Sequence, residues 1–376
     1  MRRNESSFFL VTALILLTAM LAFGATTLTR STTDLYGSSR SVATHRAFHL
    51  AEAAVDAVMT NIQGGQFDNL LIAQMTGGNY WATVDPVAAL TYRIHGHGLL
   101  GSDQRDLEAI VRVTPHSVFD FALFGSEHLI VSGEAITDSF DSGVGAYDPD
   151  APGNNGDIGT NSTASGSVNV SGTIAINGQI AVGAETGDPS TVVVISGGSA
   201  LITGQPPIVP QSTPLAMPQV TVPDGLSCTD LSVTGNTTLL LPSALGQHCF
   251  NNLTVSGGAT LTADGPVTVY VTGAFTASGN TVIGVASDPS AMIILLVSSQ
   301  QATIESSLTG SSAFYGGLYA PSATITIDGN AQVFGSVVAQ GVTISGDAQV
   351  HYDEALGELT DPIGRYDTTL LSWYEP

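Results

Sequence analysis

A five-residue motif that recurs between residues 129 and 346 constrains the fold of this chain more than any other feature. In each copy, two apolar residues flank one residue, and then Ser, Thr or Asp is followed by Gly. Gly235, Gly257 and Gly279 are 22 residues apart, and Gly329 and Gly346 are 17 residues apart. The copies begin at Leu129, Val168, Val193, Leu231, Leu253, Phe275, Ile325 and Val342.

This repeat predicts a right-handed parallel β-helix over residues 118–356. A short alternating strand buries its apolar residues by stacking on similar strands above and below, while Gly adopts the positive-φ corner. A β-sandwich is the alternative, because evenly spaced short strands fit it as well. The constant phase of the Ser-Gly corner favours the solenoid.

The charge of the chain is strongly acidic and excludes one class of partner. Its 376 residues include 32 acidic and 9 basic residues, every basic one is Arg, and no basic residue stands between Arg112 and Arg365. Nucleic-acid binding requires clustered cations that neutralise phosphates, so we expect no nucleic-acid partner. The acidity is typical of a soluble, exported surface.

The N-terminus predicts the compartment. The segment Phe8–Leu28 is long and apolar enough to span a bilayer, and Arg2 and Arg3 precede it. Positively charged flanks stay in the cytoplasm, so we expect an inner-membrane anchor with the remaining residues in the periplasm or outside the cell. A cleaved signal peptide is the alternative, with a small-residue cleavage site between Ala19 and Ala25.

The helical pattern continues beyond the apolar segment. Apolar residues recur at spacings of three and four as far as Ile62, and Gly64-Gly65 supplies a stop. We therefore predict one long helix from about Ser7 to Ile62, with Gly24 and Gly37 as the points where it could be interrupted. The residues of this second apolar stripe are Ala47, Phe48, Ala51, Val55, Val58, Met59 and Ile62.

The apolar segment, together with Arg46-Ala47-Phe48 and Ala51-Glu52-Ala53-Ala54, resembles the N-terminal region of PilX-like minor pilins of type IV pili. The resemblance implies that a prepilin peptidase removes a short basic leader and that the helix packs with other pilins. Ser7 stands where the family usually has the glycine before the cut, which makes Phe8 the first mature residue. Thr12 stands where major pilins carry a glutamate, so we expect a place at or near the filament tip.

A second resemblance covers residues 118–356, through Gly316–Pro321, Ile325–Ala331 and His351–Leu356. These segments resemble the β-helical region often attached to PilX-like N-termini, and the resemblance implies an architecture without a catalytic role. We predict four parts: a leader and helix (1–65), a small α/β linker (66–117), the β-helix (118–356) and a tail (357–376).

Few residues suggest a specific site. Cys228 and Cys249 lie about one turn of the repeat apart, and two cysteines cannot form a tetrahedral zinc site alone, so we predict a disulfide in an exported protein. An oxygen-rich turn is a weak Ca²⁺ candidate, with a solvated turn as the simpler interpretation, and no other cofactor is expected. Its residues are Asp148, Asp150, Asn154 and Asp157.

Other polar residues favour a non-enzymatic protein. His95 and His97 share one strand face, but no carboxylate or cysteine pattern completes a metal site. Lyase chemistry lacks a basic residue in the body, and no nucleophile elbow accompanies His248 or His351. Two functions remain open: a structural minor pilin that displays an adhesive β-helix, and a stand-alone anchored binder, with a surface polysaccharide as a possible partner. A β-helical carbohydrate-active enzyme is a lesser alternative, for which the nearest carboxylate pairs in the sequence are Asp138 with Asp141 and Asp353 with Glu354. The simpler interpretation of His351-Tyr352-Asp353 is a terminal cap that closes the last turn of the repeat.

Overall fold

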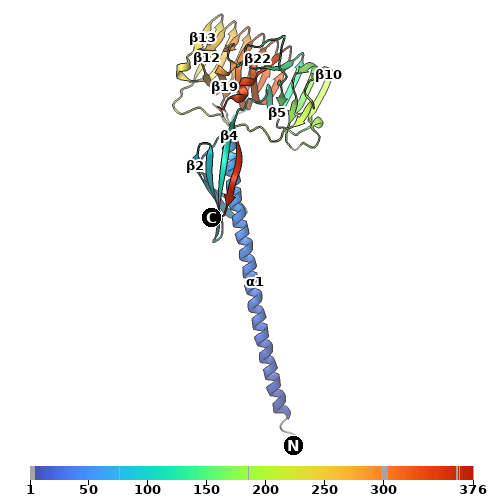
Figure 1. Ribbon diagram of the computed structural model, residues 1–376, viewed down its shortest axis with the longest axis vertical. Helices are drawn as coiled ribbons and strands as arrows, with labels where there is room; N and C mark the ends of the chain where they lie inside the picture. The colour runs from blue at the N-terminus through green and yellow to red at the C-terminus, as the bar shows by residue number, and fades with distance from the viewer. Residues whose placement is uncertain are drawn as a thin grey trace. The chain divides into compact units, whose positions relative to one another are not determined.

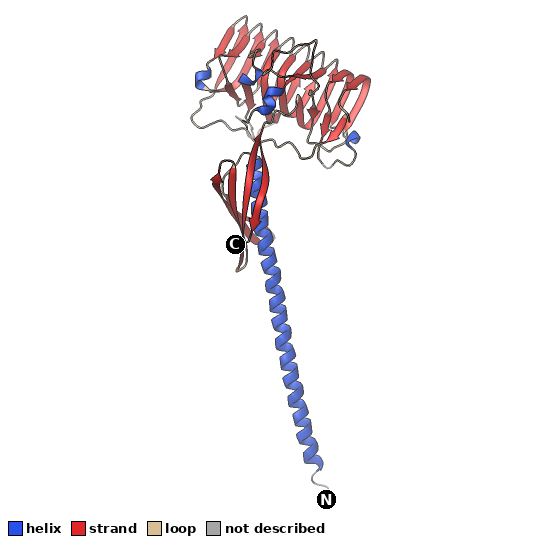
Figure 2. Ribbon diagram, in the orientation of Figure 1, coloured by secondary structure: helices blue, strands red, loops and turns tan. Residues whose placement is uncertain are grey.

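The computed structural model describes residues 5–75, 77–184, 186–297, 304–360, 363 and 365–375. The chain is mainly β with one long N-terminal helix (Figures 1 and 2). It divides into two compact units. The first comprises Met1–Ile62, Gln66–Thr114 and Thr368–Pro376, and the second, here called the β-body, comprises Gln63–Gly65 and Pro115–Asp367.

In the first unit, helix α1 (Glu5–Gln63) packs its C-terminal half against an antiparallel sheet. Small residues such as Ala47 and Ala51 are fully buried there, and Gly96 and Gly98 approach them from β3. A Cβ on Gly96 would lie 2.6 Å from the Ala51 carbonyl oxygen, so this close contact requires Gly. The sheet order is β1 (Leu70–Met75), β2 (Gly78–Ala88), β3 (Thr91–Leu100), β4 (Asp103–His116) and β24 (Arg365–Tyr374).

The N-terminal half of α1 is different. Its large apolar side chains from Leu14 to Leu35 are exposed within this unit, with Phe23 at 74%. The helix is continuous through Gly24 and Gly37, and it is long and apolar enough to cross a membrane, judged by length and composition. The predicted helix thus extends slightly beyond its expected bounds, and the two glycines do not interrupt it.

The predicted domain boundaries miss two parts of the first unit. Residues 66–117, expected as a linker, form the sheet that covers α1. The C-terminal segment, expected as a tail, contains strand β24 beside β4, and Trp373 contacts Phe48 of α1 at a ring distance of 6.2 Å. The prediction of a tail is wrong because the partners of this strand lie more than two hundred residues earlier in the chain.

The β-body is built from strands that pair in parallel, and the motif copies are in register with one another. Their glycines form the corners, with φ of 90° at Gly133 and 110° at Gly172, where a side chain is disfavoured.

We distinguish three ladders of paired strands, and several strands contribute to two or to all three of them. The first ladder runs in the order β12 (Thr229–Gly235), β14 (Gln247–Gly257), β17 (Phe275–Gly279), β20 (Ile304–Leu308), β21 (Ala313–Ile327), β22 (Gln332–Ile344), β5 (Leu123–Gly133), β8 (Val168–Ile176) and β10 (Val193–Ile202).

The second and third ladders follow the same spatial order. The second contains β13 (Thr238–Leu241), β15 (Thr260–Ala263), β18 (Val282–Gly284), β21, β22, β23 (Gln349–Asp353), β6 (Ile136–Phe140), β8 and β10. The third contains β14, β16 (Val267–Val271), β19 (Met292–Leu296), β21, β22, β5, β7 (Ile158–Gly159), β9 (Ile180–Val182) and β11 (Ile208–Pro210). Short 3₁₀ turns occur at Pro189–Thr191, Ser243–Leu245, Pro289–Ala291 and Glu354–Glu358.

The spatial order of the ladders differs from the chain order. The chain enters at β5, continues to β10 at one end, crosses to β12 at the other end, and returns until β22 lies against β5. The crossing segment lies on the outer side of the third ladder, where Leu215 and Val220 pack into a second apolar cluster with Phe124 and Tyr319. The main core, which includes Val131, lies between the ladders.

Candidate functional site

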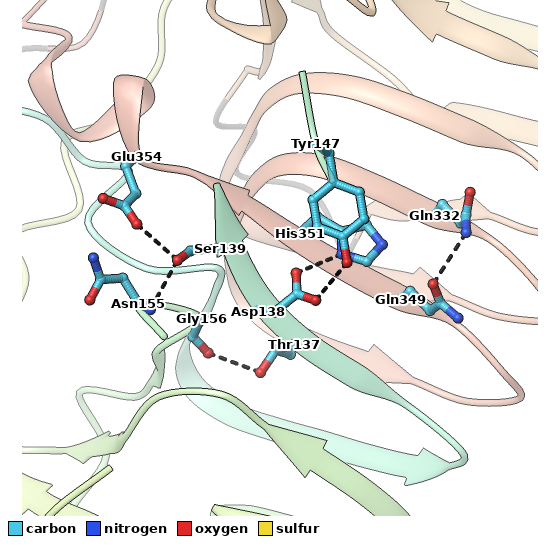
Figure 3. A network of polar contacts seen from close by, with 10 residues as sticks. All are labelled: Thr137, Asp138, Ser139, Tyr147, Asn155, Gly156, Gln332, Gln349, His351 and Glu354. Carbon is cyan, nitrogen blue, oxygen red and sulfur yellow. Dashed lines mark hydrogen bonds and ion pairs between the residues drawn. The ribbon is translucent and has the colours of Figure 1, made fainter. Parts of the chain in front are cut away.

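A buried polar group of the β-body lies where β23, near the end of the repeat, pairs with β6, near its beginning. Strand β23 pairs with β6, and His351 is directly opposite Asp138 in the register. Both side chains are almost fully buried, at 3% and 4% exposed. We call the group around this pair the seam cluster, and Figure 3 shows it.

Asp138 is the centre of the seam cluster. Its Oδ1 lies 2.6 Å from Nδ1 of His351, and its Oδ2 accepts a hydrogen bond of 2.8 Å from the Tyr147 hydroxyl. Burial and the neighbouring Asp138 carboxylate raise the pKa of Tyr147, so this phenol stays protonated and donates. One carboxylate therefore holds two side chains, from β23 and from the loop after β6.

Aromatic rings extend the seam cluster along the second ladder. Tyr315 stacks on Phe334 with ring centres 4.6 Å apart, and Phe334 lies 4.9 Å from His351. Tyr147 covers His351 at 3.9 Å. The hydrogen-bonded pair of His351 and Asp138 is thus shielded from water by aromatic rings.

A second set of polar contacts joins the same two chain segments. The Ser139 hydroxyl donates to Oε1 of Glu354 at 2.8 Å and accepts from the backbone N–H of Asn155 at 3.0 Å. Asp353 is fully buried and accepts from both the N–H and the hydroxyl of Ser142, at 2.9 and 2.7 Å. Burial raises the pKa of Asp353 even though these hydrogen bonds favour its ionised form.

The arrangement does not assemble a nucleophile with a base. A Ser-His-Asp site needs the serine hydroxyl on the histidine, whereas Ser139 donates to Glu354. Asp138, considered from the sequence as one half of a carboxylate pair with Asp141, is instead occupied by His351 and Tyr147. The described geometry therefore favours a structural role, in which the seam cluster fastens the end of the repeat to its beginning.

No local sequence signal identifies this cluster. His351 and Asp138 are 213 residues apart, and His351 was expected in a cap that closes the last turn of the repeat. The structure places it inside the ladder instead, because β6 continues the stack beyond β23. No role was predicted for Tyr147.

The cysteine pair joins the residue before β12 to the adjacent strand β14. Cys228 and Cys249 form a disulfide with Cα atoms 4.5 Å apart, and Cys249 belongs to the apolar cluster over the third ladder. The bond therefore ties the end of the crossing segment to β14. The predicted processing residues Ser7 and Phe8 lie within α1, and their side chains and residues 1–4 are outside the described part of the chain.

The Ca²⁺ candidates are engaged separately. Asp148 accepts from the N–H of Asp150 at 3.0 Å, while Asp157 accepts from the N–H of Gln179 at 2.7 Å. Asp148, Asp150 and Asn154 are exposed, and burial raises the pKa of Asp157. Within the described residues, no three His, Cys, Asp or Glu side chains group around a point where a metal would fit. Calcium binding stays a prediction.

The histidines of β3 pair with carboxylates of β4. His97 Nδ1 lies 2.7 Å from Asp106, and the ring of His97 stacks on Trp81 at 5.1 Å. His95 Nδ1 lies 3.5 Å from Glu108. Both rings are thus on the sheet face opposite α1, since the alternating Gly96 and Gly98 face the helix.

One outer face of the β-body carries regular hydroxyl groups. The residues between the two apolar positions of the motif point outward, and six successive strands of the first ladder carry Ser or Thr there. These side chains form a first row of hydroxyl groups. A second row of hydroxyl groups lies two residues further along each strand and begins with Thr234, Ser256 and Ser278. The first row consists of Ser232, Thr254, Thr276, Ser307, Thr326 and Thr343, paired in register and all partly or fully exposed.

Comparison with known proteins gives few matches. Residues 247–359 match a domain of unknown function, DUF7305. None of the curated proteins matches the sequence.

Three solved structures share distant similarity with the chain. An ice binding protein from an Antarctic Biological Consortium has 14% identity and a TM-score of 0.35, with 64% of this chain and 91% of that chain covered. The DUF3494 domain of a Shewanella frigidimarina ice-binding protein has 14% identity and a TM-score of 0.35, with 62% and 94% covered. The competence-associated pilin ComZ from Thermus thermophilus has 11% identity and a TM-score of 0.25, with 89% and 97% covered. Similarity at this level transfers no function.

Proposed function

We propose that this protein is a non-enzymatic, pilin-like component of a type IV filament, anchored by α1, that displays a right-handed parallel β-helix outside the cytoplasm. The observation that carries the proposal is the contrast between the two halves of α1. The C-terminal half is buried against the sheet through Ala47, Ala51 and Val58, whereas the half that includes Leu16 and Phe23 leaves its apolar side chains exposed.

An apolar helix surface of this extent needs a membrane or other helices around it. Water would have to solvate most of the apolar segment Phe8–Leu28, at a cost of roughly 25 cal/mol for each Å² of apolar surface. A bilayer removes that cost before assembly, and neighbouring pilin helices remove it in a filament. Both environments suit the N-terminal resemblance to PilX-like proteins.

The β-body supports display rather than catalysis. Its parallel, in-register ladders support the β-helix, and its seam cluster uses its polar groups internally. We place the protein at or near the filament tip. Thr12 lacks the charge that pairs with a neighbouring subunit's amino group in the family, and a β-body of this size crowds a shaft made for small heads.

The test is the mature N-terminus of the protein in the cell envelope and in sheared filaments. We expect processing before Phe8, more complete in Ser7→Gly, with Ser6→Gly as the matched control. Antibodies to the β-body should label one end of each filament. Uniform labelling would contradict the tip position, and an unprocessed protein that is absent from filaments would contradict the pilin proposal.

The hydroxyl rows favour a second candidate, a stand-alone anchored protein that binds a neutral polysaccharide. Adjacent strands and alternate residues space these hydroxyl groups about 4.8 Å by about 6.7 Å apart, and no Lys or Arg stands between Arg112 and Arg365 to attract an anionic ligand. Thr276→Glu with Thr326→Glu should then abolish sedimentation of the full chain with insoluble neutral polysaccharide. Thr260→Glu, on the second ladder, is the control. Equal sedimentation of both variants would contradict this candidate.

A further inference from the structure

The two ends of the β-body leave core positions uncovered. Strand β10 is last in the first ladder, where Ile195 aligns with Val170 of β8. Val170 is fully buried, but Ile195 is 48% exposed because no further described strand covers it. Ile202, near the end of the same strand, aligns with the fully buried Ile176 but is only partly buried itself.

The opposite end of the β-body also leaves apolar core positions uncovered. Leu231 of β12 and Leu239 of β13 align with Leu253 and Leu261, which are fully buried. Leu231 and Leu239 are only partly buried, although they pack on the main core. Repeat proteins usually cover such ends with polar capping repeats, which prevent further stacking. Among the described residues, neither end of the first ladder has a capping strand.

The two ends match each other because both carry the motif. Inside the β-body, the apolar positions of adjoining motif copies pair in parallel and in register, as Leu253 and Val255 of β14 do with Phe275 and Ala277 of β17. In β10 this register with β8 holds from Val193 to Ser196 and shifts by one residue after Ser196. Strand β10 presents Val193-Val194-Ile195-Ser196-Gly197, and β12 presents Leu231-Ser232-Val233-Thr234-Gly235. The order and direction of the ladder therefore allow β12 of another copy to follow β10.

The third ladder ends differently. Strand β11 contains Pro210 and follows Pro206 and Pro207, which have no backbone N–H to offer a new strand. Proline is a common means of blocking edge pairing. By contrast, β10 contains no proline and no charged residue over its ten positions. The first and second ladders are therefore the ones open to extension.

We propose that the β10 end of one β-body stacks on the β12 and β13 end of a second copy of this chain, so that the ladders continue across the contact. Ile195 and Ile202 become covered, and the edge strands gain the backbone hydrogen bonds that interior strands already have. The contact uses different surfaces on the two copies, so it can link more than two molecules. This self-association does not depend on the proposed place in a filament.

The test exploits the difference between the two ends. Ile195→Lys blocks the β10 end and Leu231→Lys blocks the β12 end, and each introduces a charge into a surface that would lose water. The full chain in detergent is followed by light scattering over a range of concentrations. We expect each variant alone to associate at least about tenfold more weakly than the wild type. Val144→Lys, on a loop residue that is 87% exposed, is the matched control and should associate normally.

Mixing the two blocked variants gives the decisive result. Their remaining ends are complementary, so the mixture should form dimers and nothing larger. If Leu231→Lys alone still dimerised while Ile195→Lys did not, the contact would be symmetric, and head-to-tail stacking would be wrong. A wild type that stays monomeric at all concentrations would also overturn the proposal.

A second measurement avoids substitutions at core positions. Continued register places Val194 of one copy opposite Ser232 of the next, and both side chains are exposed and point outward. Val194→Cys mixed with Ser232→Cys should form an intermolecular disulfide under mild oxidation. Val144→Cys mixed with Ser232→Cys should not. Equal cross-linking in both mixtures would overturn the predicted register.

Discussion

His351 and Asp138 are 213 residues apart in the sequence, and their side chains lie 2.6 Å apart across paired strands in the interior of the β-body. The pair connects β23, near the end of the repeat, with β6, near its beginning. Tyr147 adds a hydrogen bond to the same carboxylate. This relationship makes the seam cluster the first place to test how the β-body is stabilised.

Asp138→Ala should destabilise the β-body strongly. The substitution leaves the buried His351 and the Tyr147 hydroxyl without their acceptor, and breaking a buried pair costs about 3–5 kcal/mol. Urea unfolding followed by circular dichroism measures the change. Asp148→Ala, at an exposed position, is the control and should change stability little. Equal effects of the two substitutions would show that the buried pair contributes nothing.

Removing the disulfide should have a smaller effect. The bond between Cys228 and Cys249 closes a loop with a sequence separation of 21, and such a loop contributes about 3 kcal/mol in the chain-entropy model. The double substitution Cys228→Ser, Cys249→Ser should lower the free energy of unfolding by that amount. Reducing agent should lower the unfolding midpoint of the wild type and leave that of the variant unchanged. Two free thiols in the purified protein would refute the assignment.

The buried Asp353 predicts a specific pH dependence. Burial raises its folded-state pKa above the unfolded value of about 3.9. Its contribution to stability is therefore fully present below the unfolded value, and is lost as pH rises through the raised folded value. Compared with Asp353→Asn, the wild type should gain stability as pH falls from roughly 7 to roughly 4. Parallel pH profiles of the two proteins would contradict the raised pKa.

Gly96→Ala tests the packing of α1 on its sheet. A Cβ at this position would lie 2.6 Å from the Ala51 carbonyl oxygen and 2.8 Å from a Val55 methyl group. Overpacking of this kind costs typically about 1–3 kcal/mol. Hydrogen exchange should show faster opening of β2 to β4. Gly145→Ala has no atom within 4 Å of the added carbon and should leave exchange unchanged.

The repeated motif predicted the local structure of the β-body well. Copies such as Leu253–Gly257 and Phe275–Gly279 pair in parallel and in register, with their glycines at positive φ. The reason is local. Each copy has two apolar residues on either side of one outward-facing residue, and a corner Gly follows them. A strand with this pattern has few other ways to bury its apolar side chains. The order of the ladders was not predictable in this way. All motif copies are alike, so the motif does not determine which copy adjoins which.

The same limit explains the missed seam cluster and the missed strand β24. Asp138 is an ordinary polar residue of β6 in the sequence, and its partner His351 comes from a distant part of the chain. Strand β24 has an apolar pattern that ends in Trp373, but its partner β4 lies far away in the sequence. Such contacts depend on which distant strands pair in the folded protein, so they produce no periodic pattern in the local sequence. The disulfide could be predicted from the sequence because two cysteines allow only one pairing.

The position of β5 between β8 and β22 has a consequence for folding during synthesis. Strand β5 is made early, yet the Ser132 hydroxyl bonds the Ile344 carbonyl, 212 residues later. A nascent chain that has just completed β10 therefore presents β5 as an open edge, with its partner still unmade. Folding that depends on such distant contacts is slow, so the chain stays incompletely folded during its synthesis. The β-body closes only after nearly all of it has emerged, and until then its open edge requires protection from pairing with other chains.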